Sequence, residues 1–186
     1  MPRFVRRVPE GDDRERSVCE ICGFVDYQNP RVIVGSVVVA GEAVLLCRRG
    51  IEPRRGFWTL PAGFLELNET IEEGAAREAW EEARARIAVE GILGIFNISR
   101  IGQVQVIFRA KFDGPVAYES GPESQDVQLF TFATIPWSQI AFPSVVWSLQ
   151  AWWKGAGRPL GPPVGNPPDD PRGMRRPGMD AQEGPL

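Results

Sequence analysis

The sequence predicts an α/β protein, because β-rich runs alternate with helical patterns along its 186 residues. Two runs of β-branched and apolar residues, 31–40 and 43–48, are joined by a Gly-Glu pair that indicates a hairpin. A helical pattern follows over residues 70–87, and an apolar-faced helix is expected from residue 143 or 144 to 153. A chain of this length fits one domain with tails and can bury a core without disulfides.

Three further strands and two terminal segments complete the predicted organisation. The strands are expected at residues 92–98, 103–112 and 127–133. The last 32 residues are about half Gly or Pro and are expected to be disordered, since such a segment buries too little apolar area to offset its ordering entropy. The chain therefore divides into a charged N-terminal element (1–28), a central domain (29–154) and a Pro/Gly-rich tail (155–186).

The absence of histidine limits the chemistry that this chain can perform. Ser-His-Asp and Cys-His nucleophiles cannot be assembled, and His-rich catalytic zinc sites are excluded. Acid–base chemistry near pH 7 must use carboxylates, Lys, Tyr, Cys or metal-bound water, and a metal held by Asp and Glu is expected to be Mg or Mn. With 21 Lys and Arg against 24 Asp and Glu, the net charge is −3, which does not favour nucleic acid as a partner.

The cysteines and the N-terminal residues bear on the compartment. Cys19, Cys22 and Cys47 are too few for a disulfide scaffold and fit a reducing compartment. Residues 1–17 are polar and mixed in charge, unlike a secretory signal or a transit peptide. No stretch approaches the roughly 20 apolar residues of a membrane span. We therefore expect a cytoplasmic protein without a membrane partner.

The helical pattern that follows Thr70 begins with a capping box formed with Glu73. At about 100° per residue, three glutamates share one face of this helix: Glu78, Glu81 and Glu82. An apolar face on the other side is expected to pack on a sheet: Ala75, Ala76, Ala79, Trp80, Ala83 and Ile87. The glutamates are then expected to point into solvent, either as a plain acidic face or as a site where a divalent cation relieves their repulsion.

Six spaced residues resemble the Nudix box, G-x5-E-x7-R-E-U-x-E-E-x-G-U with U aliphatic: Gly63, Glu69, Arg77, Glu78, Glu81 and Glu82. The run Trp58-Thr59-Leu60-Pro61-Ala62-Gly63 resembles the segment that leads into that box. The chain departs from the pattern at one place, where Arg84 stands for the expected Gly and Ala85 for the aliphatic residue. We expect this departure to lengthen the last turn of the helix without removing activity.

The resemblance implies a Nudix α/β/α sandwich around a mixed β-sheet, in which the box forms a loop–helix–loop. Nudix hydrolases cleave a nucleoside diphosphate linked to another group, X, with Mg or Mn. The positions that match the box imply four metal ligands: the side chains of Glu78, Glu81 and Glu82 and the main-chain carbonyl of Ala62. Glu69 and Arg77 resemble the pair that orients these ligands. Arg49 resembles an arginine that contacts the substrate phosphate in these enzymes. The alternative interpretation of Arg49 is an ordinary charged residue at the end of a strand.

The general base stays open, because Nudix families place it differently. A glutamate of the box is one candidate, and Glu123 and Asp126 on a later loop are two others, although a solvated turn explains both. Phe64 and Trp58 either face a ring of the substrate or pack in the core. Four further tryptophans are expected to pack the terminal helix or a dimer interface: Trp137, Trp147, Trp152 and Trp153.

A narrower resemblance begins with Cys19-x-x-Cys22-Gly23 and continues in short motifs over about residues 8–153. It is to a Nudix branch that carries an N-terminal zinc ribbon and hydrolyses ADP-ribose or FAD. The Ser-Gln-Pro-Trp-Pro-Phe-Pro motif of the NADH pyrophosphatase branch is absent after the box. Residues 1–28 would form a partial zinc-ribbon-like element, because a closed zinc site needs four ligands. Three explanations for the missing ligands stay open: a truncated start, a zinc ion shared by two chains, and a vestigial element. Of these, we favour an element that binds no metal. A redox-active cysteine pair is disfavoured, because the usual βαβ context is missing.

These residues predict hydrolysis of the pyrophosphate bond of a nucleoside diphosphate linked to X. The expected substrate is ADP-ribose or FAD, the cofactor Mg or Mn, and one product AMP. We expect a homodimer whose partner is a nucleotide-type small molecule. Two alternatives are a Nudix module that binds a nucleotide without cleaving it and a hydrolase that sanitises oxidised nucleoside triphosphates. The intact Arg77-Glu78 and Glu81-Glu82 pairs favour an enzyme over a binding module.

Overall fold

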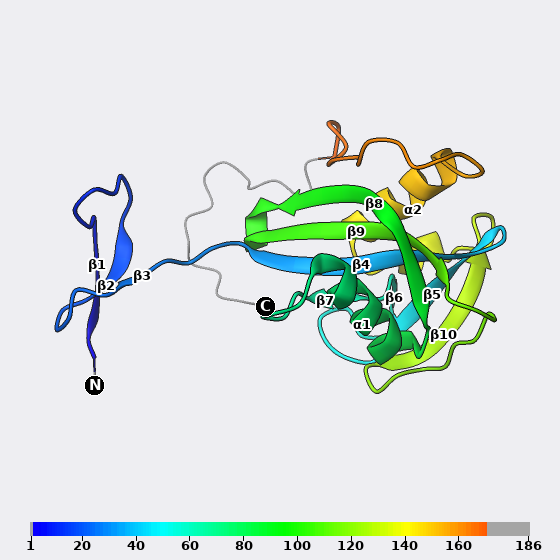
Figure 1. The fold of residues 1–186 in the computed structure, drawn as a ribbon, viewed down its shortest axis with the longest axis horizontal. Helices are drawn as coiled ribbons and strands as arrows, with labels where there is room; N and C mark the ends of the chain where they lie inside the picture. The colour runs from blue at the N-terminus through cyan, green and yellow to red at the C-terminus, as the bar shows by residue number, and fades with distance from the viewer. Residues whose placement is uncertain (1, 171–186) are drawn as a thin grey trace. The chain divides into compact units, whose positions relative to one another are not determined.

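The computed structural model describes residues 2–170, which divide into two compact units between Pro30 and Arg31 (Figure 1). The first unit is a small antiparallel sheet with strand order β1-β2-β3. Its strands are β1 (Phe4–Arg7), β2 (Arg16–Cys19) and β3 (Val25–Asp26). Val18 and Cys19 on β2 are buried. The predicted boundary at residue 28 lies close to the division between the units.

Within the described residues, the second unit contains a seven-stranded mixed sheet in the order β10-β5-β4-β9-β8, with β6 paired to β5 and β7 to β4. The strands are β4 (Arg31–Ala40), β5 (Ala43–Arg49), β6 (Trp58–Thr59), β7 (Ala62–Phe64), β8 (Ile87–Ile98), β9 (Gln103–Phe112) and β10 (Ser124–Thr131). β4 runs parallel to β9, and the other pairings are antiparallel. The helices are α1 (Ile71–Ala83) and α2 (Pro143–Lys154), with 3-10 turns η1 (Ser99–Ile101) and η2 (Trp137–Gln139).

The two α-helices cover opposite faces of this sheet (Figure 1). On β4, Val34 packs with Ala75 of α1, whereas Val37 packs with Trp147 of α2. Successive side chains of a strand point to opposite faces, so a strand covered on both sides needs apolar residues at nearly every position. That requirement explains the unbroken apolar run of β4, and the predicted α/β/α sandwich around a mixed sheet is confirmed.

Most predicted strands are confirmed, and two differ in their bounds. The strands at 31–40 and 103–112 and the hairpin that follows β4 form as predicted. The strand predicted at 92–98 begins at Ile87, and two register shifts along β8 interrupt the alternation that would have marked its first half. The strand predicted at 127–133 ends at Thr131, because the carbonyl of that residue accepts bonds from the next turn.

The predicted lengthening of the last turn of α1 is wrong. The helix ends at Ala83, and Arg84 takes the left-handed conformation, with φ of 49°. The Arg84 N–H donates to the Trp80 carbonyl at 2.9 Å, and the Ala85 N–H donates to the Ala79 carbonyl at 3.2 Å. Arginine thus adopts the backbone conformation that glycine usually supplies after a helix, and the chain turns directly into β8.

The terminal helix forms as predicted, with Pro143 in its first turn. No helix within residues 2–170 is long and apolar enough to cross a membrane.

Residues 155–170 differ from the predicted disordered tail. The main chain of Val164 bonds to β8, donating to the Leu93 carbonyl at 3.0 Å and accepting from the Ile95 N–H at 2.9 Å. The Asn166 side chain donates to the carbonyl of Asn97 and accepts from its N–H, each at 2.8 Å. These contacts cover part of an edge strand, which composition alone does not indicate. The rest of the predicted tail, 171–186, lies outside the described residues.

We expect Arg84→Gly to be more stable than Arg84→Ala by about 1 kcal/mol. Both changes remove the guanidinium, and only alanine keeps a β-carbon at a φ of 49°. Urea denaturation followed by tryptophan fluorescence measures the difference. At Arg86, whose φ lies outside the left-handed region, the glycine variant should instead be less stable than the alanine variant, because glycine adds entropy to the unfolded state. Equal stability of the two Arg84 variants would contradict the assignment.

Candidate active site

The candidate site forms where the short strand β7 passes beside α1. The Ala62 N–H donates to Oε2 of Glu82 at 3.1 Å, so the strand is bonded directly to the helix side chain. A β-carbon on Gly63 would overlap the carboxylate of Glu78. Glycine at this position therefore allows β7 and the helix to approach each other.

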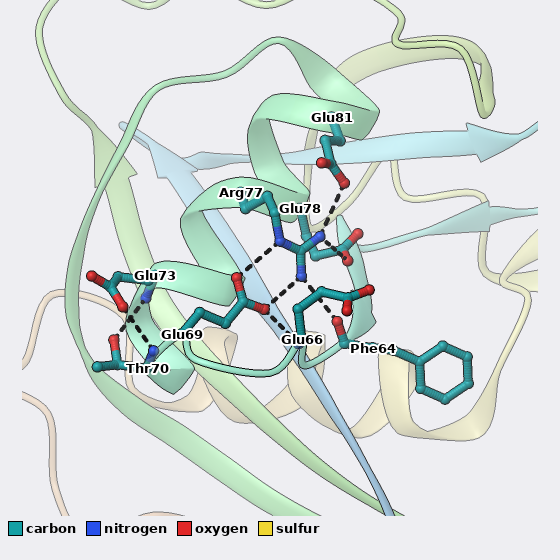
Figure 2. Close-up of polar contacts among 8 residues, drawn as sticks. All are labelled: Phe64, Glu66, Glu69, Thr70, Glu73, Arg77, Glu78 and Glu81. Atoms are coloured by element: carbon teal, nitrogen blue, oxygen red, sulfur yellow. Dashed lines mark hydrogen bonds and ion pairs between the residues drawn. The ribbon is translucent and has the colours of Figure 1, made fainter.

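The guanidinium of Arg77 joins the acidic residues of the site, as Figure 2 shows. Its Nε and Nη2 donate to the two carboxylate oxygens of Glu69, at 3.0 and 2.7 Å. Its Nη1 donates to Glu78 at 2.7 Å and to Glu81 at 3.0 Å. Nη2 also donates to the Phe64 carbonyl at 2.9 Å, which connects the network to the end of β7.

The loop before α1 is fixed by its own hydrogen bonds. The predicted capping box is present, with Glu73 N–H to Thr70 Oγ1 at 3.2 Å and Thr70 N–H to Glu73 Oε2 at 2.7 Å. Glu69 also accepts from the Glu66 N–H at 2.7 Å. The hydrogen bonds from Arg77, followed by the one from Glu66, lower the pKa of Glu69 to about 2. Glu69 is therefore a charged partner for Arg77 throughout the neutral range.

The prediction that all three glutamates point into solvent is wrong for two of them. Glu78 and Glu82 are buried, at 8% and 7% exposure, and only the side chain of Glu81 is half exposed. The reason is that β7 covers the side of α1 that the apolar face leaves open. Ala75, Ala79 and Ala83 are buried against the sheet as predicted, whereas Trp80 is 43% exposed.

Burial makes the two inner glutamates unusually basic. It raises the pKa of Glu82 to about 8, although the bond from the Ala62 N–H acts in the opposite direction. It also raises the pKa of Glu78, where the hydrogen bond from Arg77 opposes it. The negative charge of Glu123 raises the pKa of both residues further, and the positive charge of Arg49 lowers that of Glu82. Glu123 and Arg49 therefore lie within electrostatic reach of the cluster.

The acidic cluster fits a hard divalent cation in its donor chemistry. Carboxylate oxygens and a backbone carbonyl are the ligands that Mg and Mn prefer. With the side chains in their present positions, residues 2–170 contain no group of three acidic or cysteine side chains close enough together to hold a metal ion. Arg77 occupies the carboxylates of Glu78 and Glu81, and those bonds are the ones that a bound cation would compete for.

The two predicted bases lie on different elements: Glu123 is on the loop before β10, within electrostatic reach of the cluster, whereas Asp126, expected on that loop, lies on β10 itself. The Glu123 carbonyl accepts from the Gly50 N–H at 2.7 Å, beside Arg49. Asp126 accepts from the Gln128 side chain on β10. Its neighbour Val127 packs with Cys47 in the cluster that also contains Ala83 of α1. Because strand side chains alternate, Asp126 points to the opposite face of the sheet.

Arg49 and the aromatic residues occupy defined places. The Arg49 side chain donates to the Pro53 carbonyl at 2.8 Å and lies over the ring of Phe142. Trp58 is buried, and it packs in the core rather than facing a substrate ring. Phe64 is 47% exposed, and its ring, which points away from Arg77 in Figure 2, lies under the guanidinium of Arg31. The core alternative is therefore wrong for Phe64.

The four other tryptophans gather around α2. Trp147 and Trp152 are buried in the core, Trp137 packs against it, and Trp153 stacks on Phe132 while staying half exposed. These positions agree with the prediction that the four tryptophans pack on and around the terminal helix, α2.

Contacts that the sequence did not indicate connect the loop carrying Glu123 to the end of α1. The Gly121 N–H donates to the Glu82 carbonyl at 3.0 Å, and the Glu119 N–H donates to the Ala83 carbonyl at 2.9 Å. A β-carbon on Gly121 would overlap the carbonyl of Glu81. The Gly-Pro pair at 121–122 was the available signal, and it marks only a turn.

The two N-terminal cysteines lie on one tight turn. Cys19 is buried and Cys22 is exposed, on a tight turn closed by the Gly23 N–H, which donates to the Cys19 carbonyl at 2.9 Å. Backbone N–H groups of Cys22 and Ile21 lower the pKa of the Cys19 thiol. Cys47 lies in the core of the other unit, where burial raises its pKa. The described residues of the first unit thus supply two thiols and do not complete a four-ligand zinc site.

Two family models match the chain. The model of the NUDIX domain matches residues 29–147, and a model of the Nudix N-terminal zinc ribbon matches residues 2–28. Among solved structures, a NUDIX hydrolase from Nitrosomonas europaea is 42% identical, with a TM-score of 0.83 over 88% of this chain and 93% of that one.

Three curated relatives are similar over part of their length. A MutT-like protein of Streptomyces ambofaciens is 41% identical over 54% of this chain and 63% of the relative. An ADP-ribose pyrophosphatase of Methanocaldococcus jannaschii is 25% identical over 69% of this chain and 78% of the relative. The NAD-capped RNA hydrolase NudC of Pseudomonas aeruginosa is 30% identical over 68% of this chain and 46% of the relative. The matched region therefore spans less than two thirds of the first and the third.

In the absence of divalent cations, we expect the free energy of unfolding to fall as pH rises from 4.5 toward about 8. Folding raises the pKa of Glu82 from 4.5 to about 8, so its contribution is fully present below 4.5 and is lost as pH rises through the folded value. Chemical denaturation in EDTA across this range measures the slope. Glu82→Gln should flatten it, and Glu72→Gln, on the exposed side of the first turn, should not. An unchanged slope in Glu82→Gln would contradict the assignment.

Proposed function

Because the chain belongs to the Nudix hydrolase family, we propose that it hydrolyses the pyrophosphate bond of ADP-ribose in a reaction that depends on Mg or Mn and releases AMP and ribose 5-phosphate. The observation that carries this proposal is the arrangement of four carboxylates around Arg77 and Ala62, two of them buried with raised pKa. A purely structural acidic face would leave these side chains in solvent. Their burial is a cost that a cation-binding role explains.

The side chains of Glu78, Glu81 and Glu82 and the carbonyl of Ala62 would hold the cation. When bound, it supplies charge neutralisation for the pyrophosphate and a water of lowered pKa. Glu69 fixes the guanidinium of Arg77 through two parallel hydrogen bonds, and Arg77 in turn positions Glu78 and Glu81.

Two further residues have roles in the proposed reaction. Arg49 would meet a substrate phosphate, since its charge already acts on Glu82. Glu123 would take the proton from the attacking water, because its carboxylate lies within electrostatic reach of both buried glutamates.

ADP-ribose is favoured over other substrates by the Methanocaldococcus relative, which aligns over most of its own length. FAD remains in the proposal from the branch with an N-terminal ribbon. NAD-capped RNA is a second candidate, since the Pseudomonas relative aligns over a similar share of this chain. All three side chains of the proposed metal cluster are carboxylates, which disfavours a module that only binds a nucleotide.

We expect Glu81→Gln and Glu82→Gln each to lower turnover about a thousandfold or more, because each removes a negative charge from the proposed cation site. Glutamine keeps the size of the side chain and can still accept from the Ala62 N–H at position 82. Steady-state turnover is compared with that of Glu72→Gln, an exposed acid in the first turn of the same helix. Near-normal turnover in a folded variant would remove that glutamate from the proposed ligand set.

Product analysis by mass spectrometry tests the substrate. ADP-ribose, FAD, NADH, 8-oxo-dGTP and NAD-capped RNA are offered at equal concentration with Mg or Mn. We expect AMP and ribose 5-phosphate from ADP-ribose at the highest rate. AMP with FMN from FAD, or decapped RNA, as the faster product would replace ADP-ribose in the proposal. No product from any of the five, with Mn bound, would favour a module that binds without cleaving.

A further inference from the structure

A cavity lies at the C-terminal end of α1 and shares no lining residue with the carboxylate cluster. Its volume is about 400 Å³, within the range of small-molecule sites. The residues that give it chemical character are Trp80, Arg84, Arg86, Asp113, Tyr118 and Glu119. They combine cations, anions and exposed aromatic rings, which is a set that core packing does not need.

Two guanidinium groups meet at one aromatic ring in this cavity. The guanidinium carbons of Arg84 and Arg86 lie 5.6 and 5.5 Å from the centroid of the Trp80 ring. Within residues 2–170, neither arginine forms an ion pair. Neither positive charge is neutralised by a carboxylate of these residues, and a phosphate group bound by both arginines would supply that neutralisation.

Arg84 lies in the left-handed region of backbone conformation at the end of α1. Its left-handed φ of 49° costs an arginine free energy that glycine would not lose. Strained residues of this kind concentrate at ligand-binding positions, where the surrounding structure holds them in place. The side chain of this residue lies over Trp80.

The remaining groups match the rest of a nucleotide. Asp113 and Glu119 offer carboxylate oxygens, which accept hydrogen bonds from sugar hydroxyls. Tyr118 is 38% exposed, with the Phe112 ring at 6.4 Å and tilted to its own, and a base could stack on its exposed face. The two carboxylates would also disfavour a simple polyanion, because they offset the charge of the two arginines.

We propose that this cavity binds a nucleoside 5′-monophosphate, with the phosphate between Arg84 and Arg86, the ribose toward Asp113 and Glu119, and the base on Tyr118. The bound nucleotide would contact the segment that carries Glu123. That segment is joined to α1 by hydrogen bonds from the N–H groups of Glu119 and Gly121. Binding here is independent of the proposed hydrolysis and needs no divalent cation.

Isothermal titration of the whole chain with AMP in EDTA tests the proposal, since EDTA removes the cations that could hold phosphate at the carboxylate cluster. We expect saturable binding of AMP to one site, and binding at least tenfold weaker for adenosine and for inorganic phosphate. Arg84→Gly and Arg86→Ala should each weaken AMP binding at least tenfold. Arg84→Gly is the sharper variant, because glycine suits the left-handed conformation at the helix end. Arg100→Ala, an exposed arginine outside the cavity, is the control and should bind as the unmodified chain does.

Three results would overturn the proposal. The first is no binding of AMP at millimolar concentration, and the second is unchanged binding in both arginine variants. The third is inorganic phosphate binding as tightly as AMP, which would reveal an anion site without nucleotide recognition. None of these results bears on hydrolysis, which is assayed separately with Mg or Mn.

Discussion

The guanidinium of Arg77 is the interaction on which the candidate active site depends. It bonds to Glu69 in the loop before α1, to Glu78 and Glu81 on the helix, and to the Phe64 carbonyl at the end of β7. Three separate segments are therefore fixed by one planar group. A guanidinium presents its donors at fixed angles, so the positions of the carboxylates follow from the position of the arginine. A lysine has three donors on a single nitrogen, so it could not form the two parallel bonds to Glu69 while also reaching Glu78, Glu81 and the Phe64 carbonyl.

Around this arginine the fold keeps two acids in an unfavourable environment. Glu78 and Glu82 lose solvation because α1 is packed against the sheet by Ala75, Ala79 and Ala83 on one side and approached by β7 on another. The hydrogen bonds that they receive offset only part of that cost, as their raised pKa values show. The helix cannot rotate to expose them without removing its alanines from the core. The packing that stabilises the domain is thus also what forces the carboxylates together.

The elements with a regular pattern were predictable from the sequence, and the parts formed by short or irregular segments were not. The apolar run of β4 and the capping box of α1 indicated the central strand and the start of the helix. Helical spacing showed which glutamates share a face, but it carries no information about what lies opposite that face. β7 has three residues, too few for any periodicity, and it is the segment that buries Glu82. Position 84 misled because the glycine that usually marks a helix end is absent, and Arg84 takes the left-handed conformation in its place.

The way α1 ends also positions a loop of the candidate site. Had the helix continued to Ile87, the carbonyls of Glu82 and Ala83 would have accepted bonds from residues farther along the helix. Because Arg84 turns the chain away, these carbonyls are free to accept from Gly121 and Glu119 instead. The loop that leads to Glu123 is held by those two bonds, and Gly121 allows it to lie against the backbone of Glu81. The strained residue therefore does more than close a helix: it determines where the loop attaches, and so how near Glu123 lies to the buried glutamates.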